Sequence, residues 1–248
     1  MSKSPTVLEG GVLVVETMAS DINGDGLSDV ILGVIGQMGT DAGEIHVYLG
    51  TPQGLSTSPM VIRLNASPST QDYFLVWVGD AGDVNGDGFG DILVGLPQMG
   101  SNGSVCIYLG SAAGLSATPI VLPGPATPNA YWGDIAAGGG DIDGDGFDDI
   151  VVGARGMPTG SAYVYRGGPS GPSTTPDATL TSPDAGYFGD PVAFLGDVNR
   201  DGFDDVAVGS YGGGGSVYVF LGSATGLSGA PVAVSPPASD SKFGGSFQ

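Results

Sequence analysis

One acidic loop of nine residues occurs four times in this chain, and its regular recurrence restricts the chain to a repeat architecture. Each copy has a carboxylate or amide side chain at positions 1, 3, 5 and 9 and a Gly at position 6. The copies are Asp21–Asp29, Asp83–Asp91, Asp141–Asp149 and Asp197–Asp205. Their first residues are 62, 58 and 56 positions apart, so the chain consists of units of similar length.

The residues around each loop also repeat, and they predict strands. An apolar run ending in Gly follows each loop, at 30–33, 92–95, 150–153 and 206–209. A second run ends near an aromatic residue, namely Tyr48, Tyr108, Tyr165 or Phe220. An apolar or aromatic residue lies nine positions before each loop, namely Val12, Phe74, Trp132 or Phe188. Helical periodicity is absent, and each unit holds about four short strands separated by turns.

This pattern predicts an all-β fold, a β-propeller with four blades of about four antiparallel strands each, because a lone sheet of this kind cannot bury both faces. We expect a single domain over residues 1–248, with blades at about 12–72, 73–130, 131–186 and 187–241. Residues 242–248 resemble the start of a fifth unit, since Phe243 is in register with Phe188. They either close the ring as a strand or mark a cut through a larger propeller.

The loop has the ligand chemistry of a calcium site. Hard oxygen ligands in a flexible loop suit Ca²⁺, whereas Zn²⁺ prefers Cys and His and Mg²⁺ demands a smaller octahedron. The spacing begins like an EF-hand, but position 12 is Leu or Val instead of Glu. A metal-free Asx turn is the alternative, and four copies in phase disfavour it. The predicted side-chain ligands are Asp21, Asn23, Asp25, Asp29, Asp83, Asn85, Asp87, Asp91, Asp141, Asp143, Asp145, Asp149, Asp197, Asn199, Asp201 and Asp205.

Composition excludes several classes of protein. The 47 Gly and 18 Pro would allow a disordered chain, but 41% of the residues are hydrophobic, so the glycines are interpreted as turn residues. The net charge is −20, and 13 of the 26 acidic residues occupy the loop positions named above, which disfavours nucleic acid and anionic membranes as partners. The single Cys106 allows no intrachain disulfide, and no apolar run is long enough to insert into a membrane.

The loop, with Phe-Gly before it and an apolar run and Gly after it, resembles the FG-GAP repeat of integrin α-subunit propellers and of bacterial integrin-like proteins. The resemblance covers roughly residues 12–248. It implies four Ca²⁺ ions per chain, each bound in a β-hairpin, with the backbone carbonyl of position 7 as a further ligand. These carbonyls belong to Leu27, Phe89, Phe147 and Phe203. Position 4 is Gly in the first three loops and Arg200 in the fourth, and we expect the fourth loop to bind calcium more weakly.

Integrin propellers have seven blades, and this chain supplies four. We therefore expect a homodimer that forms an eight-blade ring, with a four-blade ring as the alternative. The resemblance also implies that partners bind on the face opposite the calcium hairpins. The least repeated segments, 35–43, 65–72, 96–103 and 123–131, are candidates for that surface.

The first functional hypothesis is a non-enzymatic, calcium-stabilised scaffold for protein–protein interaction or cell adhesion. We expect it at the cell surface or outside the cell, because extracellular calcium modules bind weakly enough to need millimolar calcium. Residues 1–5 do not form a signal peptide, so we expect either that the leader is absent from this sequence or that the chain is a segment of a longer protein.

Two alternatives are a glycan-binding lectin and an accessory domain of a secreted hydrolase. Sugar rings could stack on Tyr73, Trp77, Tyr131 or Trp132. Catalysis is disfavoured, because the only histidine, His46, aligns with Cys106, Tyr163 and Tyr218, as expected for a packing position. Asp80, Asp134 and Asp190 leave a glycosidase-type carboxylate pair open.

Overall fold

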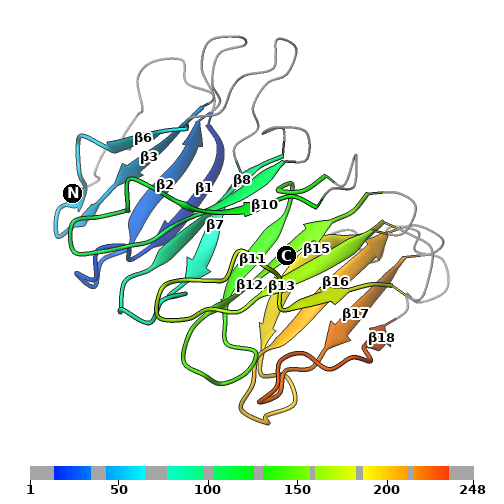
Figure 1. Cartoon of the computed structure of the whole chain (residues 1–248). Coiled ribbons are helices and arrows are strands. Elements are labelled where there is room, and N and C mark those ends of the chain that lie inside the picture. The colour runs from blue at the N-terminus through cyan, green and yellow to red at the C-terminus, as the bar shows by residue number, and fades with distance from the viewer. Residues whose placement is uncertain are drawn as a thin grey trace, which may run out of the picture.

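The computed structural model describes residues 14–34, 43–64, 77–97, 103–125, 131–156, 160–182, 187–211 and 215–234. In these ranges the chain contains only β-structure, and four antiparallel four-stranded sheets follow one another along the chain (Figure 1). A short ribbon of β4 (Gly50–Thr51) and β5 (Gly54–Leu55) accompanies the first sheet. The predicted all-β, propeller-like fold is confirmed.

Each sheet, called here blade 1 to blade 4, takes its strands in the order of the sequence. Blade 1 consists of β1 (Val14–Ser20), β2 (Asp29–Val34), β3 (Glu44–Tyr48) and β6 (Met60–Arg63). Blade 2 consists of β7 (Trp77–Gly82), β8 (Asp91–Leu96), β9 (Ser104–Tyr108) and β10 (Ile120–Pro123). Blade 3 consists of β11 (Ala136–Gly140), β12 (Asp149–Ala154), β13 (Ser161–Tyr165) and β14 (Ala178–Leu180). Blade 4 consists of β15 (Tyr187–Gly196), β16 (Asp205–Tyr211), β17 (Ser216–Phe220) and β18 (Val232–Val234).

The acidic loops join the first two strands of each blade, so all four lie at the same end of their sheets. The second strand begins at position 9 of the loop, and the apolar run after it is almost wholly buried in every blade. The first strands of consecutive blades adjoin, β1 against β7, β7 against β11 and β11 against β15. This is the arrangement of inner strands around a propeller axis.

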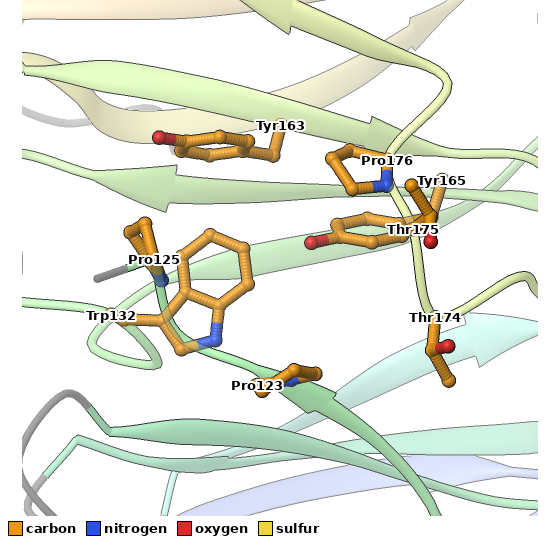
Figure 2. A pocket seen from close by; sticks show the side chains of 8 residues that line it. All are labelled: Pro123, Pro125, Trp132, Tyr163, Tyr165, Thr174, Thr175 and Pro176. Atoms are coloured by element: carbon orange, nitrogen blue, oxygen red, sulfur yellow. The ribbon is translucent and has the colours of Figure 1, made fainter. Parts of the chain in front are cut away.

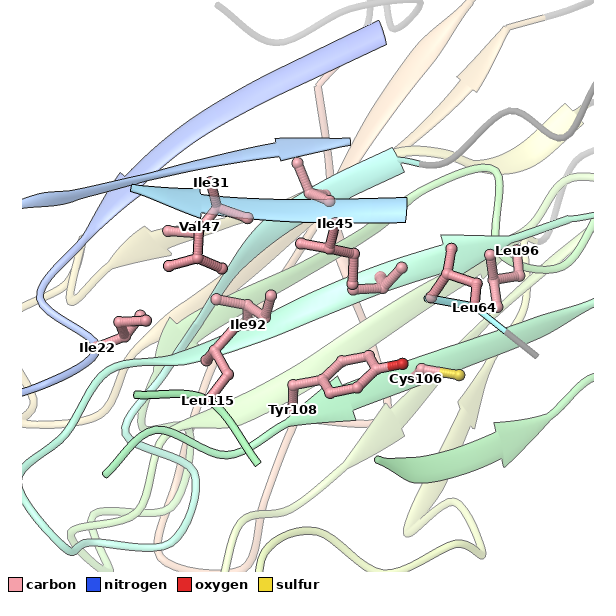
Figure 3. Close-up of a cluster of buried hydrophobic side chains, with 12 residues drawn as sticks. Ile22, Ile31, Ile45, Val47, Leu64, Ile92, Leu96, Cys106, Tyr108 and Leu115 are labelled. Carbon is pink, nitrogen blue, oxygen red and sulfur yellow. The ribbon is translucent and has the colours of Figure 1, made fainter. Parts of the chain in front are cut away.

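The hydrophobic core is divided among the seams, a term used here for the contacts between consecutive blades. At the seam of blades 1 and 2, Ile31, Ile45 and Val47 pack with Ile92 and Tyr108 (Figure 3). Similar clusters join blade 2 to blade 3 and blade 3 to blade 4. Since each sheet buries its faces against its neighbours, the blades stabilise one another.

A large aromatic side chain enters each of the last two seams nine positions before the loop. Trp132 is 1% exposed, its indole N–H donates to the carbonyl of Leu122 at 3.1 Å, and its ring meets Tyr163 edge-on with 5.2 Å between centroids. Phe188 meets Tyr218 in the same way at 5.7 Å. The equivalent Val12 and Phe74 lie outside the described residues.

Backbone hydrogen bonds connect each loop to the next blade. The N–H at position 8 of one loop donates to the carbonyl of position 1 in the preceding loop, at 2.9–3.1 Å. The donor and acceptor pairs are Gly90 and Asp21, Asp148 and Asp83, and Asp204 and Asp141. A second N–H, from the residue three positions after the end of the third strand, reaches the position-2 carbonyl of the preceding loop at 2.9–3.1 Å. These pairs are Ser111 and Ile22, Gly168 and Val84, and Ser223 and Ile142.

The close approach of consecutive loops requires a glycine at position 4. A Cβ on Gly24, Gly86 or Gly144 would lie 2.7–2.9 Å from the ring of the position-7 Phe in the next blade. These three residues also have φ between 69° and 74°, a region that favours Gly. Position 4 thus carries both a backbone and a packing constraint.

We expect Gly86→Ala to destabilise the protein by about 2–3 kcal/mol, because a Cβ would strain the backbone and collide with Phe147. The control is Gly88→Ala in the same loop, where φ is +88° but no atom lies within 4 Å of the added Cβ; it should cost about 1 kcal/mol. Urea unfolding of both variants in saturating calcium measures the difference. Equal costs would show that the seam contact contributes nothing.

Candidate metal sites

The carboxylate at position 1 organises each loop. One of its oxygens accepts the N–H of position 5 at 3.0–3.2 Å, and the other accepts the N–H of position 6 at 2.8–2.9 Å. The chain therefore curls around Asp21, Asp83, Asp141 and Asp197. Position 6 has φ of 82–95°, which explains why it is Gly in every copy.

Positions 3 and 5 contact each other in the same turn. The N–H of position 5 reaches the side-chain oxygen of position 3 at 2.9–3.3 Å, and the position-5 carboxylate accepts the N–H of position 7 at 2.8–3.1 Å. Asn23, Asn85 and Asn199 also donate their amide N–H to the position-5 carboxylate. The predicted side-chain ligands at positions 1, 3 and 5 are therefore brought together in all four loops.

The position-9 carboxylates, Asp29, Asp91, Asp149 and Asp205, are all 0% exposed. One oxygen of each accepts the N–H of position 2 at 2.8–3.1 Å. The other accepts an N–H at 2.7–2.9 Å from a Gly just after the third strand, Gly50, Gly110, Gly167 or Gly222. Each carboxylate thus joins the loop to the residues that follow the third strand, at the same end of the sheet, while retaining lone pairs for a cation.

Burial dominates the electrostatics of this position. Desolvation raises the pKa of Asp91 and of Asp149 to about 7, and it raises the pKa of Asp29 as well. Repulsion from the position-1 carboxylate adds to each shift. Groups in such a setting need a proton or a cation to offset the cost of burying charge.

The third loop is the most acidic, since Asp143 replaces the Asn found at position 3 of the other copies. Single oxygens of Asp141, Asp143 and Asp149 lie within 4.8 Å of one another, close enough to share one ion. Arg166 binds Asp143 at 2.6 Å and Asp177 at 3.1 Å. Sequence reasoning missed this pair, although Arg166 stands out because the other blades have Leu at its position.

The donor set fits a hard cation, because each loop gathers carboxylate or amide side chains of positions 1, 3 and 5 in one turn and none of the loop residues is a His or Cys. The carbonyls of Leu27, Phe89, Phe147 and Phe203 remain predicted ligands. Arg200 adopts φ of +64°, so it keeps the backbone shape of the glycines at position 4. The geometry of the fourth loop is therefore retained despite this substitution.

The residues considered for catalysis have structural partners. His46 lies 2.8 Å from Glu44, which also binds Arg63. Cys106 is buried, and desolvation raises the pKa of its thiol to about 11, so it is a poor nucleophile. Both occupy the predicted common slot, opposite Leu32 and Val94 on the second strands, as Tyr163 and Tyr218 do opposite Val152 and Val208.

The candidate acids outside the loops are also paired. Arg155 binds Asp134 at 2.8 Å and Asp190 at 2.7 Å, which bridges blades 3 and 4. Asp80 accepts hydrogen bonds from Ser20 and from the backbone of Gly82. A carboxylate pair neutralised by a shared guanidinium lacks the free acid and base of a glycosidase.

Of the aromatic residues considered for stacking on sugar rings, some lie in the core and one lies on the surface. Trp132 is core, and Trp77 packs against the same cluster. Tyr131 is exposed and lies 5.1 Å from the guanidinium of Arg155, whereas Tyr73 lies outside the described residues. A pocket of about 300 Å³ beside Trp132 is lined mainly by proline and tyrosine side chains (Figure 2).

The candidate partner segment 65–72 lies wholly outside the described residues, and of 35–43, 96–103 and 123–131 only terminal residues are described. In the part of the chain that the structure describes, no helix is long and apolar enough to cross a membrane.

Comparisons with known proteins identify relatives. A model of the FG-GAP-like repeat matches residues 21–94, 83–152 and 141–208. The chain is similar to integrin alpha-PS5 of Drosophila melanogaster, with 37% identity over 163 residues, which are 61% of this chain and 16% of that protein. It is similar to human integrin alpha-8, with 34% identity over 177 residues, 66% of this chain and 16% of that protein. The chain thus matches about one sixth of the length of these relatives.

A solved structure shares the fold. The crystal structure of rhamnogalacturonan lyase YesW aligns with a TM-score of 0.52 and 16% identity, over 84% of this chain and 46% of that chain.

Proposed function

This chain belongs to the FG-GAP-like repeat family, and we propose that it is a calcium-binding, integrin-like β-propeller that acts as a non-enzymatic scaffold for protein–protein interaction or cell adhesion. The observation that carries the proposal is a turn of the same hydrogen-bonded geometry in four loops, in which the backbone of position 5 contacts the side-chain oxygens of positions 1 and 3. In the third loop, oxygens of Asp141, Asp143 and Asp149 also lie within 4.8 Å of one another. The integrin α subunits among its relatives support the scaffold role.

In this proposal each loop holds one Ca²⁺, so the chain binds four. The ligands are the side chains at positions 1, 3, 5 and 9 and the backbone carbonyl at position 7. The ion supplies positive charge where buried carboxylates such as Asp91 and Asp149 meet the other loop acids. It also fixes the hairpin that forms hydrogen bonds with the next blade.

The proposed location is the cell surface or the outside of the cell. Calcium modules with oxygen-ligand loops outside cells bind at about 10⁻⁴–10⁻³ M, and only there is calcium high enough to occupy such sites continuously. The four blades would act together as one domain over residues 1–248, with a protein as partner on the face opposite the calcium loops.

The non-enzymatic role is supported by the pairing of the ionisable groups. Cys106 is buried, Asp134 and Asp190 are paired with Arg155, and His46 is hydrogen-bonded to Glu44, so none is poised for acid, base or nucleophilic catalysis. Turnover of a sugar polymer or ester by the purified chain would overturn this part of the proposal.

The test of the calcium sites is a direct count of bound metal. Equilibrium dialysis against calcium, followed by metal analysis, should find four Ca²⁺ per chain. The variant Asp145→Ala, which removes an exposed ligand of the third loop, should bind three and remain folded. A native chain that binds no calcium at millimolar concentration would refute the proposal.

A further inference from the structure

Blade 3 departs from the repeat at three positions, and the structure brings these three residues together. Asp143 stands at loop position 3, where the other copies have Asn. Arg166 directly follows the third strand, where each of the other blades has Leu. Asp177 accepts the backbone N–H of Arg166, a role that a serine hydroxyl has in the other three blades. Together they form what is called here the blade 3 ion-pair network.

The guanidinium of Arg166 lies between the two carboxylates of this network. One terminal nitrogen donates to Asp143 at 2.6 Å. Its Nε and its other terminal nitrogen donate to one oxygen of Asp177, at 3.2 and 3.1 Å. The second oxygen of Asp177 accepts the backbone N–H of Arg166 at 3.1 Å. Asp177 therefore binds both the backbone and the side chain of Arg166, which holds the guanidinium against Asp143.

The carboxylate that Arg166 binds also belongs to the predicted metal site. An oxygen of Asp143 lies within 4.8 Å of oxygens of Asp141 and Asp149. The side chain of Asp143 is only 5% exposed, so water screens its charge little. The residue after Arg166, Gly167, donates its N–H to Asp149 at 2.8 Å. Among the ion pairs of the described residues, only that of Arg166 with Asp143 includes a predicted ligand.

In the other three loops, position 3 is neutral and needs no cation beside it. Its Asn amide donates an N–H to the position-5 carboxylate at 2.8–3.2 Å. Asp143 is an acid without such a donor, so it repels Asp145 where an Asn would attract it. The positive charge of Arg166 offsets the negative charge that Asp143 adds to the third loop.

The charges at the ligand positions support this view of Arg166. The first, second and fourth loops each have three carboxylates at positions 1, 3, 5 and 9, whereas the third loop has four. Four negative charges and the one positive charge of Arg166 leave −3, which is the sum in each of the other loops. Since the affinity of a calcium loop depends on the charge of its ligands, a guanidinium bound to one ligand lowers the affinity of the loop.

We propose that Arg166, held by Asp177, is an internal counter-ion of the third loop and sets the calcium affinity of that loop. The guanidinium keeps this affinity near that of the other loops and reduces the repulsion among the four carboxylates when calcium is scarce. Arg166 acts through Asp143, so it is a positioning residue. The inference rests on the proposed calcium binding and deepens it, because it names the residues that control one of the four sites.

The first experiment titrates the full chain with calcium and measures the bound ions by equilibrium dialysis. Arg166→Leu, which introduces the residue of the other blades, should lower the dissociation constant of one site by about tenfold or more, because four carboxylates then bind the ion without a counter-charge. The matched control is Arg63→Leu, which removes a guanidinium paired with Glu44 and should leave all four sites unchanged. In excess chelator, Arg166→Leu should also lower the urea midpoint more than Arg63→Leu does.

The second experiment assigns the effect to the third loop and to the pair. Asp143→Asn alone should raise the dissociation constant of one site by about tenfold or more, because Arg166 then adds positive charge to a loop with three carboxylates. Asp143→Asn combined with Arg166→Leu should bind within about threefold of the native chain, since the pair then matches the other loops. In an Asp145→Ala background, which disables the third loop, Arg166→Leu should leave the three remaining sites unchanged.

Calcium binding by Arg166→Leu that is unchanged or weaker would overturn the inference. A double variant that fails to recover the native affinity would do the same, as would an effect of Arg166→Leu that persists in the Asp145→Ala background. A native chain that binds four calcium ions and does not respond to these variants would overturn this inference alone. A native chain that binds none would overturn it together with the proposed function.

Discussion

Removal of calcium is expected to lower the free energy of unfolding by roughly 6–11 kcal/mol. A site with a dissociation constant of about 10⁻⁴–10⁻³ M stabilises the folded chain by about 1.4–2.7 kcal/mol at about 10 mM calcium, and four loops share this geometry. This loss is comparable to the whole stability of many domains, so the chain should be largely unfolded in excess chelator.

The physical reason for so large an effect is the crowding of carboxylates at one end of every sheet. Each loop gathers three or four acidic side chains, and the one at position 9 is fully buried. Without a cation, their repulsion opposes the very contacts that connect one blade to the next.

Urea unfolding followed by circular dichroism, in calcium and then in excess chelator, measures the effect. Magnesium at the same concentration is the control, and it should recover little of the lost stability because it requires a smaller, more rigid octahedron. Identical unfolding curves in calcium and chelator would contradict the prediction.

Replacement of Asp149 by Ala is expected to cost about 3–5 kcal/mol beyond the loss of one calcium ion. The carboxylate accepts the N–H groups of Ile142 and Gly167, both at 2.8 Å, and it is fully buried. Removing it leaves the buried N–H of Ile142 and the partly buried N–H of Gly167 unpaired, each at a cost of up to about 1–3 kcal/mol, and a gap between the loop and the residues after the third strand.

The control for this prediction is Asp145→Ala in the same loop. Asp145 is exposed, and its carboxylate accepts only the N–H of Phe147 among the described residues. Both variants should lose the same calcium ion, so the difference between their urea-unfolding free energies in calcium isolates the buried hydrogen bonds. Equal stabilities would mean that position 9 acts only as a ligand.

Much of the architecture could be predicted from the sequence because the same loop and the same flanking apolar runs occur four times. The loop at 141–149 is followed by a buried apolar run and an aromatic at Tyr165, and the structure places strands there as expected. The sequence also predicted that the side chains of positions 1, 3 and 5 lie together, because these residues are neighbours in a single turn.

Contacts between distant residues could not be predicted, because no local signal announces them. The backbone bond from Gly90 to Asp21 joins two blades, the ion pair of Arg166 with Asp143 joins residues 23 positions apart within blade 3, and Arg155 reaches Asp134 and Asp190 across 21 and 35 positions. Glycine at position 4 is needed both for its positive φ and for the space that the Phe ring of the next blade occupies, and only the structure shows these two requirements.

The sequence by itself determined the number of blades, the strand content and the chemistry of the loops, because period, alternation and ligand spacing are local properties of a chain. Only the tertiary structure decided that the position-9 carboxylates are buried, that Trp132 lies in the core between blades 2 and 3, and that Arg155 joins blades 3 and 4. These outcomes depend on which surfaces meet, and burial and complementarity arise only when distant segments pack together.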